Sequence, residues 1–197
     1  MVSDIISAVK LFFDTIKDKK TKSREDRKTI LTNFIQPVYD MLEVSHKKYL
    51  ENFQQYRETI LQYNGFINLS HPIFEMIQKD HAMSDADRAK LVAMSEYLNT
   101  YKSEAAKELG KMPAGKLGQA VIDYITTPNY ELTQRWGFNA PRHSLLLQME
   151  SCAKSDRPDE EKKKTIIRII EEAVEKLQKQ YAGITRIYME AKADLLV

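Results

Sequence analysis

The sequence is poor in the residues that interrupt or cross-link a chain. Its 197 residues include six glycines, six prolines and a single cysteine, Cys152. Sparse glycine and proline favour a few long elements over many short strands joined by turns. One cysteine excludes an internal disulfide framework and fits a reducing compartment. These shortages predict a cytoplasmic protein built from few, long elements.

Long apolar runs and an excess of one charge are also lacking. No stretch approaches the roughly 18–20 apolar residues that a membrane-spanning helix needs, and the first residues form no basic and apolar leader, so we expect no secretory signal. Thirty Lys and Arg against 28 Asp and Glu give a net charge of +2. Nucleic acid is therefore not an expected partner. An apolar fraction of 43% still supports a packed core.

What is present is helical periodicity over unusual lengths. Apolar residues recur in 28–63 and 158–195 at a mean spacing of about 3.7 and about 3.6 residues, nearer an α-helix than the 3.5 of a coiled coil. Globular helices average about 11–12 residues. We expect an all-α fold, an elongated antiparallel helical bundle built on these two long helices with several shorter ones. Pro37 should kink the first long helix, because it removes a backbone donor and crowds the preceding turn.

We expect the chain to form a single all-helical domain over 1–197. An N-terminal amphipathic helix occupies 1–17, a charged connector follows at 18–28, and the bundle covers 28–197. The shorter helices of the bundle are expected at 72–80, 85–109, 116–126 and 144–153. One irregular, aromatic segment is expected at 127–142.

The irregular segment is the best candidate for contacts with a partner. It holds the only tryptophan, flanked by two arginines, and Trp and Arg are enriched among the residues that dominate protein interfaces. The predicted contacts, with another protein or with a second copy of this chain, are Arg135, Trp136, Phe138 and Arg142. The alternative is that Trp136 and Phe138 plug one end of the bundle.

One segment resembles a phosphate-binding loop. Gly110–Lys116 reproduces the spacing G-x-x-x-x-G-K, yet Leu117 stands where a Ser or Thr should bind magnesium. A helix, and not the required buried strand, is expected before it. The segment is interpreted as a turn between helices, and no cofactor is expected.

Two further pairs suggest chemistry but are incomplete. Glu43 and His46 have the Glu-x-x-His spacing of di-metal bundle sites, but the chain has no second such pair. His46 is therefore expected at the edge of the core, and no metal is expected. Cys152 would need His143 as a base to act as a nucleophile, and a helical cysteine is more often a small core residue.

The favoured hypothesis is a non-enzymatic interaction or assembly module within a multi-protein complex. The alternative is a membrane-surface or lipid-binding bundle that uses residues 2–28, where 17–28 carries seven Lys and Arg against three Asp and Glu. The polar face of the first helix sums to zero charge, so docking of this helix on the bundle is preferred. An enzyme with a nucleotide or metal site is the third hypothesis.

Overall fold

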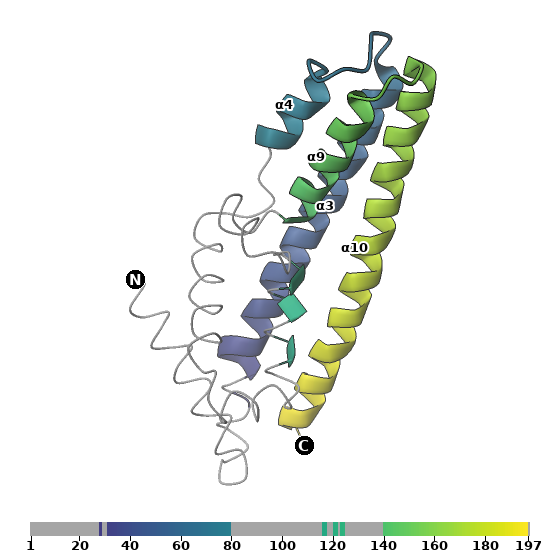
Figure 1. The fold of residues 1–197 in the computed structure, drawn as a ribbon. Helices are drawn as coiled ribbons and strands as arrows, with labels where there is room; N and C mark the ends of the chain where they lie inside the picture. The colour runs from purple at the N-terminus through teal and green to yellow at the C-terminus, as the bar shows by residue number, and fades with distance from the viewer. Residues whose placement is uncertain are drawn as a thin grey trace, which may run out of the picture. The chain divides into compact units, whose positions relative to one another are not determined.

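The computed structural model describes residues 28, 31–79, 116–117, 120–121, 123–124 and 140–196. A π-helical turn, Leu31–Ile35, leads into α3, Gln36–Gln62, which is followed by α4, Pro72–Lys79. The later helices are α9, Ala140–Ala153, and α10, Asp159–Leu196 (Figure 1). The described residues contain no strand. The predicted all-α fold class is confirmed.

The long C-terminal helix begins as its sequence predicts. The Pro158 carbonyl accepts the backbone N–H groups of Glu161 and Lys162 at 2.9 and 3.0 Å, and the first turn carries three acidic residues that complement the helix dipole. The helix runs for 38 residues, about 57 Å. Its predicted apolar stripe is the face that the structure buries, with Ala173 and Tyr181 half-buried. The fully buried members are Ile166, Ile170, Leu177, Ile184, Tyr188, Ala191 and Leu195.

The first long helix differs from its prediction at its start. The segment Leu31–Ile35 is π-helical, and the α-helix itself has 27 residues. Pro37 lacks an N–H and its ring crowds the preceding turn, so the wider π turn falls where regular α-helical winding is disfavoured. The predicted interruption at Pro37 is thus a change of winding immediately before it. Leu31 and Ile35 are buried there, although the sequence placed neither in the stripe, because a wider turn rotates the buried face.

Beyond the π turn the predicted stripe is the face of α3 that the structure buries, although its members Val38 and Tyr63 are only half-buried. The buried members are Leu42, Ser45, Tyr49, Phe53, Tyr56 and Ile60. The helix ends at Gln62, just before Asn64-Gly65, a pair that tolerates the left-handed conformation and from which the sequence predicts the end of this helix.

Contacts divide the chain into two compact units. Unit 1 comprises Met1–Val44, Met83–Tyr124 and Tyr181–Val197, and unit 2 comprises Ser45–Ala82 and Ile125–Gln180. Each unit contains part of both long helices. The single domain over 1–197 stays a prediction, and the segments 1–17, 18–27, 85–109 and 127–139 lie outside the described residues.

In unit 1 a tyrosine cluster joins α3 to α10. The Tyr39 ring stacks on Tyr188 with centroids 4.0 Å apart, and the Tyr188 hydroxyl donates to Gln36. The Tyr39 hydroxyl lies 3.1 Å from the Tyr181 hydroxyl and 2.9 Å from Thr185 Oγ1. Thr185 donates its only hydroxyl proton to the Tyr181 carbonyl, so Tyr39 donates to Thr185 and Tyr181 donates to Tyr39. Burial, together with this bonding, raises the pKa of Tyr181 and keeps the phenol neutral.

In unit 2 the same two helices pack with α4 and α9. Arg57 Nε lies 3.0 Å from Glu171 Oε1, and Lys163 contacts the Leu61 carbonyl, so the two long helices are antiparallel here as they are in unit 1. The predicted helix over 72–80 is confirmed as α4, which contacts α9. The core of α4 and α9 consists of Ile73, Phe74, Ile77, Leu145, Leu146, Met149, Cys152 and Ala153.

Helix α9 begins earlier than the sequence predicted. It starts at Ala140 and not at Ser144, so residues 140–142 belong to a helix and not to the irregular segment. Pro141 fits this start, because proline is tolerated in the first turn, where its missing N–H would have no helical partner.

The tyrosine cluster predicts a selective loss of stability. Tyr39→Phe removes the hydroxyl that both donates and accepts between the helices, so it should lower the free energy of unfolding by roughly 1–2 kcal/mol. Tyr63→Phe is the control, because the Tyr63 hydroxyl bonds to none of the described residues, and its effect should stay below about 0.5 kcal/mol. Urea unfolding followed by circular dichroism measures both. Equal losses in the two variants would contradict the proposed bonding.

Candidate functional site at the α3–α4 loop

The contact residues predicted from the sequence are not brought together in the described part of the chain. Arg135, Trp136 and Phe138 lie outside the described residues, and Arg142 belongs to α9 with a side chain that is not described. These contacts stay a prediction. Most of the Gly110–Lys116 segment also lies outside, but Leu117 is a buried helical residue.

The buried histidine of the Glu-x-x-His pair lies deeper than predicted. His46 is buried and not at the core boundary, because the residues on both sides of the stripe of α3 are covered by packing. Burial lowers the pKa of His46, which favours the neutral imidazole. Among the described residues there is no group of three His, Cys, Asp or Glu side chains able to hold a metal ion.

Cys152 is the core residue that the sequence predicted. It is buried, and its thiol donates a 3.7 Å hydrogen bond to the Lys162 carbonyl. Burial raises the pKa of the thiol, against the weaker opposing effect of Arg157 and Lys162. A raised pKa disfavours the thiolate, which is the reactive form. Cys152 thus contributes to packing in the described structure.

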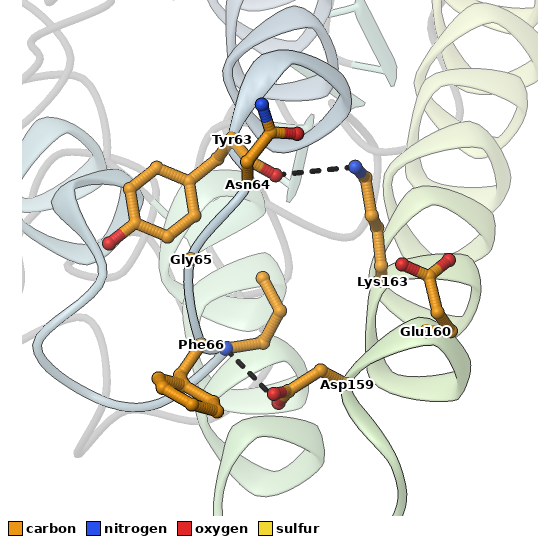
Figure 2. Close-up of a pocket in the computed structure, with 8 residues that line it drawn as sticks. Tyr63, Asn64, Gly65, Phe66, Asp159, Glu160 and Lys163 are labelled. Carbon is orange, nitrogen blue, oxygen red and sulfur yellow. Dashed lines mark hydrogen bonds between the residues drawn. The ribbon is translucent and has the colours of Figure 1, made fainter.

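The loop between α3 and α4 forms the most distinctive surface of unit 2. The loop passes over the first turn of α10, and a cavity of about 210 Å³ lies between them (Figure 2). The residues that line the cavity are Tyr63, Asn64, Gly65, Phe66, Ile67, Asp159, Glu160 and Lys163.

A glycine lets the loop leave α3 tightly. A Cβ at Gly65 would lie 2.5 Å from the Tyr63 ring, and the Gly65 backbone is not left-handed. The sequence pointed to Asn64-Gly65 as a pair tolerant of the left-handed conformation. The structure gives a different reason, which is the close approach of the neighbouring aromatic ring.

Charged side chains of α10 fix the loop by bonding to its backbone. Asp159 Oδ1 accepts the Ile67 N–H at 3.2 Å, and Lys162 Nζ donates to the Ile67 carbonyl at 3.4 Å. Lys163 Nζ donates to the Leu61 carbonyl at 3.0 Å and to the Tyr63 carbonyl at 3.3 Å (Figure 2). The last carbonyls of a helix have no partner within it, and here Lys163 supplies one. These bonds tie the loop to α10.

His71 closes the other end of the loop and begins α4. Its Nδ1 accepts the Ile73 N–H at 3.1 Å, and its carbonyl accepts the Phe74 N–H at 3.1 Å. The ring packs edge-on against Tyr63, with centroids 4.1 Å apart. Burial lowers the pKa of His71. Ser70 and His71 both precede Pro72, a residue favoured in the first turn of a helix, so the sequence allows either of them as the start of this helix. The structure selects His71.

The fixed loop presents apolar side chains to solvent. Phe66 is 77% exposed and Leu69 is 48% exposed, and Leu61, in the last turn of α3 before the loop, is 42% exposed. Sequence reasoning missed these residues, although the signal is visible in apolar positions within a segment that carries turn residues, Asn64 to Ser70. Ligand pockets commonly enclose about 300–1,000 Å³. The cavity beside Phe66 is smaller and suits a single side chain.

No known protein family matches the chain, and no curated protein or solved structure is significantly similar to it. None of the described helices combines the length and the apolar character required to cross a bilayer. A role for the loop is therefore inferred from the residues of this chain alone. Asp159, Lys162 and Lys163 are engaged with backbone groups. The exposed side chains of the loop are the apolar Phe66 and Leu69 and the polar Asn64, Asn68 and Ser70.

The bond from Asp159 to the loop predicts a difference between two neighbouring acidic residues. Asp159→Ala removes the acceptor for the Ile67 N–H and a charge that favours the helix dipole. Glu160→Ala, the control, removes a dipole-favouring charge but no bond to the loop. The free energy of unfolding should fall by about 1 kcal/mol more in the Asp159 variant, and the Ile67 amide should exchange faster with solvent. Indistinguishable urea unfolding curves for the two variants would show that the bond contributes nothing.

Proposed function

We propose that the protein is a non-enzymatic interaction module that binds another protein through the α3–α4 loop. The observation that carries this proposal is a loop held by several bonds to α10 that nevertheless leaves Phe66 largely exposed. An aromatic side chain in solvent forgoes about 1.5–3 kcal/mol that its burial would provide. A partner that covers Phe66 gains this free energy.

Two features favour a protein as the bound species. Phe is enriched at protein interfaces. Two further apolar side chains are exposed nearby in the chain, Leu69 in the same loop and Leu61 in the last turn of α3. The bonds from Lys163 and Asp159 hold the loop before binding, so less conformational entropy is lost when the partner docks. The cavity beside Phe66 then accepts one side chain of the partner.

The proposal keeps the hypothesis drawn from the sequence and moves its main contact. The protein is a cytoplasmic component of an assembly, and the segment around Trp136 supplies a second contact. The membrane-surface alternative depends on residues 2–28. Only Lys28 of that segment is among the described residues, so the alternative stays a prediction.

Replacing the exposed phenylalanine tests the contact. Full-length tagged protein is used to recover partners from native extract, and Phe66→Ser should reduce the recovery of a direct partner by about tenfold or more. Val44→Ser is the matched control, because Val44 is also exposed and apolar but lies within α3. Both changes are at exposed positions, so the fold should keep its stability within about 0.5 kcal/mol.

The same purification separates the two proposed contacts. Trp136→Ala should reduce recovery if the irregular segment takes part, with Phe66→Ser acting independently. Recovery of the same proteins in the same amounts by wild type, Phe66→Ser and Val44→Ser would show that the loop is not a contact. Sedimentation of the purified chain identifies the case in which the partner is a second copy.

A further inference from the structure

We propose that His71 is an acid-sensitive latch, in which protonation of the imidazole releases the start of α4 and loosens the loop that carries Phe66. The latch is a property of the isolated chain. Its role in controlling partner binding rests on the function proposed above.

The latch depends on the hydrogen bond that the imidazole accepts. Nδ1 accepts the Ile73 N–H, so in the folded state this nitrogen carries no proton and the hydrogen is on Nε2. Protonation would add the ring's second hydrogen, and this hydrogen would lie on Nδ1, directly facing the Ile73 N–H that Nδ1 now accepts. The cap would become a contact between two donors, and the first turn of α4 would lose its acceptor.

The surroundings of the ring give the charged form no compensation. His71 is 2% exposed, and its Nε2 has no hydrogen-bond partner among the residues that the structure describes. The Tyr63 ring packs against it. An imidazolium in this position would therefore lack both water and a counter-ion, which makes its burial costly.

No charged group in the described structure is bonded to the ring. Asp159, Lys162 and Lys163 bond to the backbone of the loop, and burial is the only cause of the lowered pKa of His71. The charged or titratable groups of α4 are Glu75 and Lys79, and those of α9 are Arg142, His143, Glu150 and Cys152. The first two turns of α10 carry Asp159, Glu160, Glu161, Lys162, Lys163 and Lys164, and the last two turns of α3 carry Arg57 and Glu58.

The direction of the pH dependence follows from the sign of the shift. The folded state lowers the pKa of His71, so the opened state binds a proton more readily than the closed state. The stabilising contribution of the neutral cap is present above the opened-state pKa of about 6.5 and is lost as the pH falls below it. At about pH 5.0, the opened state is favoured by a factor of up to about 30, which is one plus ten to the power of the difference between that pKa and the pH.

Amide hydrogen exchange on the full chain, followed by NMR, tests the latch. Protection factors of Ile73 and Phe74 are measured at about pH 7.5 and about pH 5.0, corrected for the intrinsic pH dependence of exchange. In the wild type they should fall at the lower pH, by at most about 30-fold, the limit set by the opened-state pKa. The protection factor of Ile67 should also fall, because the loop loses its attachment at the α4 end.

His71→Asn is the matched control. Asparagine is a good helix cap and does not titrate in this range, so protection of Ile73 and Phe74 should change by less than about twofold between the two pH values. His46 and the other histidines titrate equally in both proteins and cancel in the comparison. An equal loss of protection in both proteins, or no loss in the wild type, would overturn the proposal.

The exchange measurement needs no partner and so separates the latch from the proposed function. Acid-dependent exchange confined to the wild type supports the latch even if Phe66→Ser binds its partners normally. The opposite result, with partner recovery dependent on Phe66 and exchange independent of His71, overturns the latch and leaves the contact in place.

Discussion

The burial of the apolar face of α10 against α3 is the interaction on which the described structure depends. Both faces repeat at the period of an α-helix, so each helix can cover the other over many turns. The Tyr39, Tyr181 and Tyr188 cluster in unit 1 and the Arg57–Glu171 pair in unit 2 show the same antiparallel direction. Most of the favourable free energy comes from the buried apolar surface, because an exposed ion pair contributes about 0–1 kcal/mol.

The antiparallel direction explains the α3–α4 loop. It brings the first turn of α10 to the last turn of α3, so side chains that favour a helix start lie beside carbonyls that lack helical partners. Asp159 then accepts a backbone N–H of the loop while Lys163 donates to two carbonyls. The end of α3 has carbonyls without hydrogen-bond donors, and the start of α10 supplies those donors. The loop between α3 and α4 is fixed as a result. The exposed Phe66 is a consequence of that geometry.

Several of the described polar groups hold backbone in place. His71 caps α4, Lys163 donates to a carbonyl in the last turn of α3, and the Cys152 thiol donates to a carbonyl in α10. Side chains engaged in this way lose mobility and present no free pair for acid and base chemistry at these positions. The same engagement gives the proposed latch its sensitivity, since a cap made by a histidine titrates near neutral pH whereas one made by asparagine or serine does not.

The sequence by itself determined the all-α class, the start of α10 near Pro158 and the buried stripes of both long helices, because helical period and capping are local properties of the chain. The burial of His46 and the exposure of Phe66 were decided only by the tertiary structure. Each depends on which surface another segment covers, and a one-dimensional pattern does not contain that information. His71 lies between the two cases. Its position before Pro72 marked it as one of two candidate caps, but only its burial against Tyr63 made it a candidate latch.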